Sequence, residues 1–408
     1  RDIGVTGVQT CALPILIAQL DHLTGGQKQL LKRVLDKHTV LFDGKLGCYT
    51  GKKVHLELID NATPSWKRAY PVPFTREKAF KNELDEMVKE KTIERCHESS
   101  EWAAPSFIIP KQDDTVRFIN DFRELNKNLK RKPYKLPRIQ DIMNKRKNYT
   151  YCTKIDLSMF FHCLMLDDES RKLCTINTPF GLYCFNRLPQ GAKVSPDLAQ
   201  AVIEKILQHI DTDAYLDDCC LFTDKDFEHH VDLIDKLLTA LADAGMKCNP
   251  LKCAWAVKET SFLGHWMTPT AVKPMQKKID AILKMDSPKN QTQVRSFIGA
   301  VNFYRSMWPR CAHLMKPLTE LTGKGSFVWT DRQQNAFDTL KAVMTADCLN
   351  AYPDYNKPFK IYTDASNYQL GAAIIQEGQP IAYWSRSLQS NQMKYTTTEK
   401  ELLAIILG

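Results

Sequence analysis

The sequence predicts an α+β protein, and three features near its centre support this prediction. Two short apolar runs flank the adjacent acids Asp217 and Asp218, as expected for two strands joined by a tight turn. Residues 195–210 begin with Ser-Pro-Asp, a typical helix start, and then keep apolar side chains at helical spacing. Residues 227–241 repeat that spacing after the hairpin. We therefore expect helices packed on one face of a small antiparallel sheet.

Periodicity places the other elements on both sides of this centre. Apolar residues three or four apart indicate helices, and short apolar runs bounded by proline indicate strands. After Pro274 the pattern is helical, and a strand-rich unit begins at residue 359. The expected helices span 27–38, 80–88, 277–285, 292–307 with a continuation to 321, and 332–344, and the expected strands span 54–58, 105–110, 151–157, 163–166 and 359–364.

The composition is that of a globular protein with more than one domain. The 408 residues are 43% hydrophobic and 25% charged, which suits two or three domains with sizeable cores. No apolar run approaches the roughly 18 residues of a membrane span, and residues 11–18 are too short and lack the basic lead of a signal peptide. The 13 cysteines form no Cys-x-x-Cys pair, so we expect reduced thiols in an intracellular protein, without zinc or disulfides.

The N-terminal residues differ in character from the rest of the chain. Residues 5–15 resemble the in-frame translation of a sequencing-library adapter oligonucleotide. We expect residues 1–15 to be an artefactual leader without function. A genuine flexible leader is the alternative, and it would be equally silent about function.

A basic segment suggests contact with nucleic acid. Residues 111–148 hold twelve Lys or Arg against five Asp or Glu, a surplus of seven positive charges in 38 residues. Phe118, Phe122, Tyr134 and several prolines lie between the charges, which suits a surface laid along a phosphate backbone. An ordinary solvated face is the alternative for any such run.

The paired aspartates suggest a metal site. Two like charges at the tip of a hairpin repel each other, and a divalent cation such as Mg²⁺ relieves that repulsion through hard carboxylate oxygens. Asp156, at the end of the expected strand 151–157, is the best candidate for a third acid. The alternative is a plain surface turn, since Asp-Asp is a common turn dipeptide. Phe161, five residues after Asp156, could pack against a deoxyribose or simply belong to the core.

Several motifs together resemble the reverse transcriptases of gypsy-type long-terminal-repeat retrotransposons. Asp156, residues 188–191 followed by Ser195 and Pro196, and residues 215–218 have the order and rough spacing of a reverse transcriptase palm. The likeness covers about residues 20–408. Further similar motifs are the fingers motif at 117–126, the primer grip at 262–265, and the thumb and connection motifs at 294–299, 302–305 and 316–319.

The resemblance implies a right-hand polymerase fold with fingers, palm and thumb, then a helical connection and a truncated ribonuclease H-like α/β domain. It also implies domain boundaries. The expected parts are the leader at 1–15, an N-terminal extension at 16–65, fingers and palm at 66–272, thumb and connection at 273–350, and the N-terminal part of a ribonuclease H domain at 351–408.

The same resemblance assigns residues of the polymerase site. Two Mg²⁺ ions, with Mn²⁺ as a substitute, would be held by Asp156, Asp217 and Asp218. Where the family usually has Gly and Gln near the gate, this chain has Phe160 and Cys163, which leaves the three acids unchanged. The remaining assignments are Lys111 and Arg117 for the triphosphate, Phe161 as steric gate, Gln190, Gly191 and Tyr215 for the nucleotide pocket, and Phe262, Leu263 and Gly264 for nucleic acid.

The C-terminal segment resembles the first strands of a retroelement ribonuclease H. The similar stretches begin at residue 363 and continue through residue 405. Asp364 and Glu401 would be its first two metal-binding catalytic acids, with Glu399 as a competitor for the second role. Because the sequence stops at Gly408, we expect this part to be unable to cleave RNA.

The predicted function is that of an RNA-directed DNA polymerase of a retrotransposon. Its expected partners are an RNA or DNA template, a primer and dNTPs, together with the protease and integrase parts of the intact polyprotein. Its expected location is the cytoplasm, in a virus-like particle of the intact element, or the nucleus. An RNA-dependent RNA polymerase and an inactive remnant that only binds nucleic acid are the alternatives.

Overall fold

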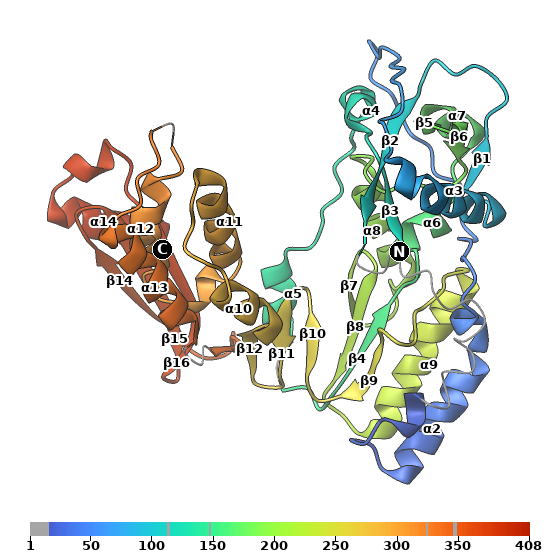
Figure 1. Ribbon diagram of the computed structural model, residues 1–408. Helices are drawn as coiled ribbons and strands as arrows, with labels where there is room; N and C mark the ends of the chain where they lie inside the picture. The colour runs from blue at the N-terminus through green and yellow to red at the C-terminus, as the bar shows by residue number, and fades with distance from the viewer. Residues whose placement is uncertain (1–15, 112–114, 147, 324, 346–348) are drawn as a thin grey trace. The chain divides into compact units, whose positions relative to one another are not determined.

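The computed structural model describes residues 16–111, 115–146, 148–323, 325–345 and 349–408, so the expected leader at 1–15 lies outside the described residues. The chain forms two compact units (Figure 1). The first unit comprises Arg1–Arg138 and Thr150–Val257, and the second comprises Ile139–Tyr149 and Lys258–Gly408. Among the described helices, none combines the length and apolar character needed to cross a membrane.

The first unit contains the predicted central sheet. It is a four-stranded antiparallel sheet, called the palm sheet here, with the strand order β7-β8-β4-β9. The helices α8 (Ser195–Ile206) and α9 (Phe227–Asp243) pack against it, as the apolar spacing predicts. The strands are β7 (Thr212–Tyr215), β8 (Asp218–Thr223), β4 (Tyr151–Asp156) and β9 (Ala254–Val257).

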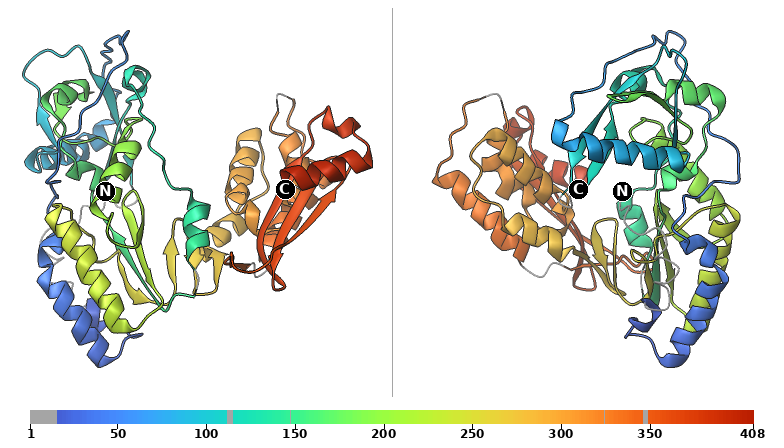
Figure 2. Two further views of the ribbon diagram at one scale, coloured as in Figure 1. Left: turned by 180° about the vertical axis from the view of Figure 1, so that it is seen from behind. Right: turned by 45° about the vertical axis from the view of Figure 1, so that its right-hand side comes forward.

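Residues next to each end of the helix α9 determine where it begins and ends. Its N-cap residue Asp226 accepts a hydrogen bond from the backbone N–H of His229 at 2.8 Å. Beyond its end, Gly245 has φ +73°, and a Cβ there would lie 1.9 Å from the carbonyl oxygen of Cys48. The helix α2 (Gly25–Lys37) lies beside α9 in every view (Figures 1 and 2). The apolar face of α2 thus extends the core of the palm.

The segment before residue 60 does not form the strand expected at 54–58. It makes only isolated bridges, from Val54 to Leu166 and from Leu58 to Leu129. The backbone N–H of Val54 donates to the carbonyl of Met165 at 2.7 Å. Its partners are themselves irregular segments, so no continuous ladder can form.

A five-stranded sheet makes up the rest of the first unit. Its strand order is β1-β6-β5-β2-β3, and the helix α3 (Phe74–Lys89) packs on it through Phe80, whose ring meets those of Phe118 and Phe180. The strand expected at 105–110 is confirmed within β2. The strands are β1 (Ile93–Arg95), β6 (Gly181–Phe185), β5 (Thr175–Thr178), β2 (Ala104–Pro110) and β3 (Val116–Asn120). The short helices α4 (Arg123–Asn128) and α7 (Asp168–Leu173) lie between β3 and β5 in the sequence.

The second unit has a helical part that differs from the expected one. A sheet of the order β10-β11-β12-β13 accompanies the helices. Its first three strands end by Pro274, and only β13 of this sheet lies in the region after Pro274 where helices were expected. The helix expected at 292–307 ends at Asn302. After Pro309, Arg310 adopts φ +54° and starts a new helix. The elements are α5 (Ile139–Lys145), β10 (Thr260–Phe262), β11 (His265–Met267), β12 (Ala271–Pro274), α10 (Gln276–Leu283), α11 (Gln291–Asn302), α12 (Cys311–Glu320), α13 (Asp331–Thr345) and β13 (Asn350–Ala351).

A three-stranded antiparallel sheet completes the second unit. Its order is β14-β15-β16, and the C-terminal helix α14 (Thr397–Leu407) packs on β14 and β15. Leu370, Leu388 and Ala404 form the buried cluster between them. The strands are β14 (Lys360–Ala365), β15 (Gln369–Gln376) and β16 (Gln379–Ser387).

A buried histidine fastens α9 to the palm sheet. His230 is fully buried, and its two ring nitrogens lie 2.8 Å from the hydroxyls of Thr153 on β4 and Thr223 on β8. The hydroxyl of Thr153 also accepts a hydrogen bond from the backbone N–H of Ala256 on β9 at 2.9 Å. Burial, with a smaller contribution from His229, lowers the pKa of His230 from 6.5 to about 4. The folded protein therefore holds this imidazole neutral.

This burial predicts a pH dependence of stability. The unfolded chain takes up a proton at His230 near pH 6.5, and the folded chain does so only near pH 4. The contribution of His230 to the free energy of unfolding is therefore complete above pH 6.5 and is lost as the pH falls toward 4. The loss approaches about 3 kcal/mol, because one pKa unit corresponds to about 1.4 kcal/mol. Urea unfolding between pH 7 and pH 5 should show this slope, and His230→Gln should reduce it. An equal slope in both proteins would contradict the assignment.

Candidate active site

The palm sheet brings three of the predicted acids together at one end. Tyr215 pairs with Asp218 across the β7–β8 hairpin, so Leu216 and Asp217 form a two-residue turn, and Leu216 has φ +55°. On the other side of β8, Asp218 pairs with Asp156 of β4. The carbonyl of Asp217 accepts a hydrogen bond from the backbone N–H of Leu157 at 2.9 Å. The turn is therefore fixed against the end of β4.

The electrostatics of this end of the sheet favour a bound cation. Loss of solvation, followed by the charges of Asp218 and Asp217, raises the pKa of Asp156 to about 6, although Lys252 and Lys154 oppose the shift. Burial and the charge of Asp218 also raise the pKa of Asp217. Solvent and the nearby lysines therefore stabilise the charged forms of these carboxylates only in part.

The residues present fit a divalent metal by their chemistry and by the elements that carry them. Carboxylate oxygens are the ligands that Mg²⁺ prefers, and the strand register places two of the three acids opposite each other. The side chains do not form a complete coordination shell. Within the described part of the chain, no group of three or more His, Cys, Asp or Glu is arranged to hold a metal ion. Asp218 instead pairs with Lys154, whose Nζ lies 3.0 Å from its Oδ1.

The gate candidate Phe161 lies in a short helix and not before a strand. The sequence suggested a strand at 163–166, but residues Phe160–Cys163 form the single-turn helix α6, which starts after Met159 at φ +48°. Phe161 is half-buried, and its ring lies 6.2 Å from that of Phe160. A helical turn here redirects the chain as it leaves the β4 strand, so the strand prediction for 163–166 was wrong.

Arg187 supports this turn, although no sequence motif singled it out. Its buried guanidinium donates to the carbonyls of His162 at 2.8 Å and Gly47 at 2.7 Å, and more distantly to that of Lys91. A buried arginine always carries its charge, and three carbonyls compensate it here. An arginine next to the motif at 188–191 was the available signal.

The predicted triphosphate and pocket residues lie on two neighbouring features of the first unit. Arg117 is exposed on β3, and Lys111 follows β2, where its backbone N–H donates to Thr115 at 2.8 Å. The strands β2 and β3 pair with each other, so both cations belong to one hairpin. Residues 112–114, between the two strands in the sequence, lie outside the described residues.

The loop that carries Gln190 and Gly191 is held by side chains from both sides. The amide of Asn126 donates to the carbonyl of Gly191 at 2.9 Å and accepts from the N–H of Lys193 at 2.7 Å. The hydroxyl of Ser195 donates to the carbonyl of Pro189 at 2.8 Å, so Ser195 anchors the loop and does not act as the N-cap of α8. Gln190 itself is exposed.

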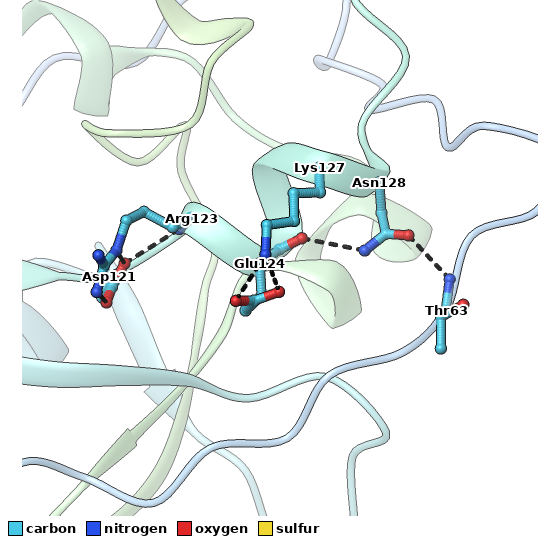
Figure 3. Close-up of polar contacts among 6 residues, drawn as sticks. All are labelled: Thr63, Asp121, Arg123, Glu124, Lys127 and Asn128. Carbon is cyan, nitrogen blue, oxygen red and sulfur yellow. Dashed lines mark hydrogen bonds and ion pairs between the residues drawn. The ribbon is translucent and has the colours of Figure 1, made fainter.

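Polar residues in and next to the fingers motif make contacts that hold the fold together. Arg123 forms a double hydrogen bond with Asp121, with distances of 2.8 and 2.6 Å (Figure 3). This interaction, which outweighs burial, lowers the pKa of Asp121 to about 2. In the next helical turn, the side chain of Asn128 accepts from the backbone N–H of Thr63 at 2.9 Å (Figure 3). Asn128, just after the motif, thus ties α4 to the N-terminal extension.

In the second unit, the predicted primer-grip residues form a tight turn. Phe262 pairs with His265, and the two residues between them, Leu263 and Gly264, have φ +48° and +81°. Positive φ at both central positions defines a type I′ hairpin turn. The hydroxyl of Tyr304 donates to the carbonyl of Gly264 at 2.6 Å. Phe262 is fully buried, so its part in the turn is to anchor it.

The two ribonuclease H candidates lie close to each other in the second unit. Asp364 is exposed on β14, and an oxygen of Glu401 on α14 accepts a hydrogen bond from the backbone N–H of the next residue, Ala365, at 3.3 Å. The competitor Glu399 caps α14 instead, because its carboxylate accepts from the N–H and hydroxyl of Thr396 at 2.7 and 2.8 Å.

Comparison with known families agrees with this architecture. Residues 109–267 match the family described as "Reverse transcriptase (RNA-dependent DNA polymerase)", and residues 329–408 match the "RNase H-like domain found in reverse transcriptase". The two matches lie in the order that the sequence motifs predicted.

Relatives are found among transposon polyproteins. The retrovirus-related Pol polyprotein from transposon 297 of Drosophila melanogaster is 32% identical over 400 residues, which cover 95% of this chain and 38% of the relative. That from transposon opus is 30% identical over 419 residues, covering 96% and 41%. The Tf2-7 polyprotein of Schizosaccharomyces pombe is 28% identical over 348 residues, covering 83% and 26%. The chain therefore spans less than half the length of these relatives.

Solved structures share the fold. The foamy viral protease-reverse transcriptase in complex with an RNA/DNA hybrid matches with a TM-score of 0.89 and 22% identity, over 100% of this chain and 56% of that one. The same protein in complex with double-stranded DNA matches with a TM-score of 0.87 and 23% identity, over 100% and 86%. The predicted fold class is thus confirmed. The chain belongs to the reverse transcriptase family, with a reverse transcriptase domain and an RNase H-like domain homologous to those of long-terminal-repeat transposon Pol polyproteins.

Proposed function

We propose that this chain is an RNA-directed DNA polymerase that extends a primer 3′-hydroxyl with dNTPs. The observation that carries the proposal is the meeting of Asp156, Asp217 and Asp218 at one end of the palm sheet. These three carboxylates would hold two Mg²⁺ ions, or Mn²⁺ in their place. The bound metal would activate the 3′-hydroxyl and stabilise the leaving pyrophosphate.

The protein's own residues position the reactants. The β2–β3 hairpin presents Lys111 and Arg117, cations of the kind that bind the triphosphate of an incoming nucleotide. The loop at Gln190 and Gly191 would line the pocket for its base and sugar, with Tyr215 at the start of the turn. Phe161 would occupy the space of a ribose 2′-hydroxyl and so exclude ribonucleotides. This last role separates the proposal from an RNA-dependent RNA polymerase.

Nucleic acid binding would rest on basic and turn residues. The basic residues of 111–148 and the turn residues Leu263 and Gly264, which the buried Phe262 anchors, are the proposed contacts to template and primer. The foamy viral structures contain an RNA/DNA hybrid or double-stranded DNA, which supports a duplex as the ligand here. The transposon relatives support a larger polyprotein as the context of the chain.

Removal of one carboxylate tests the metal role. Asp217→Asn should lower the rate of primer extension by about a thousandfold or more, since losing a metal ligand removes several kcal/mol of transition-state stabilisation. Template–primer affinity should stay within a few-fold. Asp224→Asn, an exposed change at the other end of β8, is the control and should keep full activity. If Asp217→Asn extends primers normally, the proposed site is wrong; an inactive parent chain would favour the binding-only remnant.

Reduction of the gate side chain tests sugar selection. Phe161→Val opens space where a 2′-hydroxyl would clash, so the preference for dNTPs over rNTPs should fall by about tenfold or more. Single-nucleotide incorporation assays with each dNTP and rNTP measure the ratio, and the dNTP rate serves as the internal control. Unchanged selectivity would remove Phe161 from this role.

Salt dependence tests the basic surface. The logarithm of the template–primer affinity should fall linearly with the logarithm of the salt concentration, by about 0.7–0.9 per phosphate contact. Lys135 is exposed within the basic segment, so Lys135→Gln should reduce this slope by about one contact. Lys236→Gln, an exposed change on α9, should leave it unchanged. A salt-insensitive affinity would contradict the proposal.

A further inference from the structure

The turn that carries the paired aspartates contains a backbone conformation that its sequence does not favour. Leu216 has φ +55° at the first central position of a two-residue hairpin turn, where glycine is the usual residue. A bulky side chain at positive φ is uncommon and persists only when its surroundings hold it. The strained residue directly precedes Asp217 and Asp218. What holds Leu216 therefore also sets the place of both acids.

Gln200 holds the Leu216 side of the turn, while the backbone N–H of Leu157 holds the carbonyl of Asp217. Gln200 lies on α8, is fully buried, and its Oε1 accepts a hydrogen bond from the backbone N–H of Leu216 at 2.8 Å. Its Nε2 donates to the carbonyl of Ala214 at 2.9 Å, on the preceding strand. One amide thus engages the backbone on both sides of Tyr215.

The orientation of this amide is fixed by a second acceptor. The same Nε2 donates to a carboxylate oxygen of Glu204, one helical turn further along α8, at 2.8 Å. The other carboxylate oxygen of Glu204 accepts from the hydroxyl of Tyr134. A flipped Gln200 would point its oxygen at a carboxylate and a carbonyl and its NH₂ at an N–H, so only the observed orientation satisfies all groups.

We propose that Gln200 is a positioning residue that holds the Leu216 turn so that the acids are placed for metal binding. The inference rests on the proposed polymerase function. One helix, α8, contacts both proposed parts of the site. Ser195 in the first turn of α8 anchors the loop of Gln190, and Gln200 in the second turn anchors the aspartate turn. α8 thereby sets the distance between the proposed nucleotide pocket and the proposed metal site.

The direct test is amide hydrogen exchange at Leu216 in the complete chain. Gln200→Met keeps the side-chain volume and removes all three hydrogen bonds, so exchange at Leu216 should accelerate by about tenfold or more, while amides in the middle of β4 and β8 keep their protection. The affinity of the free chain for Mn²⁺ should fall by about fivefold or more. In primer extension, kcat should fall while the KM for template–primer stays unchanged.

A matched control and a rescue separate positioning from general damage. His230→Gln alters another buried polar contact of the same sheet and should leave exchange at Leu216 and Mn²⁺ affinity unchanged. Leu216→Gly, added to Gln200→Met, removes the strain and should restore part of the Mn²⁺ affinity and of kcat. Equal effects of His230→Gln and Gln200→Met would overturn the proposal.

A second variant covers the case in which Gln200→Met does not fold. Glu204 is only half-buried, so Glu204→Ala should fold; it frees the amide of Gln200 to flip and should raise exchange at Leu216 in the same direction by a smaller factor. Unchanged exchange in Glu204→Ala and in any folded Gln200 variant would refute the clamp. A parent chain that extends no primer would instead refute the proposed function, and the exchange and Mn²⁺ data would still decide whether Gln200 holds the turn.

Discussion

The pairing of β4 with β8 places Asp156 directly opposite Asp218, and the rest of the polymerase unit is arranged around this pairing. Burial at this end of the sheet, and then the neighbouring negative charges, raise the pKa of Asp156 to about 6. Lys154 compensates part of that charge at Asp218. A divalent cation would compensate more, and would compete with Lys154 for the same carboxylate. An unfavourable juxtaposition of this kind persists only because the sheet beneath it is firmly held.

Three helices hold the sheet, each at a different point. α9 is fastened from below by His230, which bridges β4 and β8 through two threonine hydroxyls. α8 is fastened to the β7–β8 turn by Gln200. α6 follows β4 and is fixed by the guanidinium of Arg187. Each of these contacts is made by a buried polar side chain. Loss of one of its hydrogen bonds would leave the partner group unsatisfied. His230 and Arg187 therefore stabilise the palm, whereas Gln200 contacts the turn that carries the acids.

Sequence analysis predicted the long amphipathic helices and the acidic hairpin, because these signals are local. The helix expected at 27–38 is found as α2, and that at 227–241 as α9. The strand expected at 54–58 is not formed because its partners are distant in the sequence and irregular. The sheet of β10–β13 was not predicted because each of its strands has only two to four residues. Arg187 and Gln200 were not singled out, since the carbonyls and N–H groups that they bind lie up to 140 residues away in the chain. The three acids could be named from motifs, whereas the contacts that hold them could not.

The central claim is that Asp156, Asp217 and Asp218 bind divalent metal as one site. Its most direct test is calorimetric titration of Mn²⁺ into the chain bound to a template and a 3′-deoxy-terminated primer with the matching dNTP, carrying Asp364→Asn and Glu401→Gln to remove the second candidate site. We predict uptake of about two ions per chain, falling to one or fewer when Asp156→Asn is added. Uptake that is unchanged by Asp156→Asn, or no uptake at all, would contradict the account.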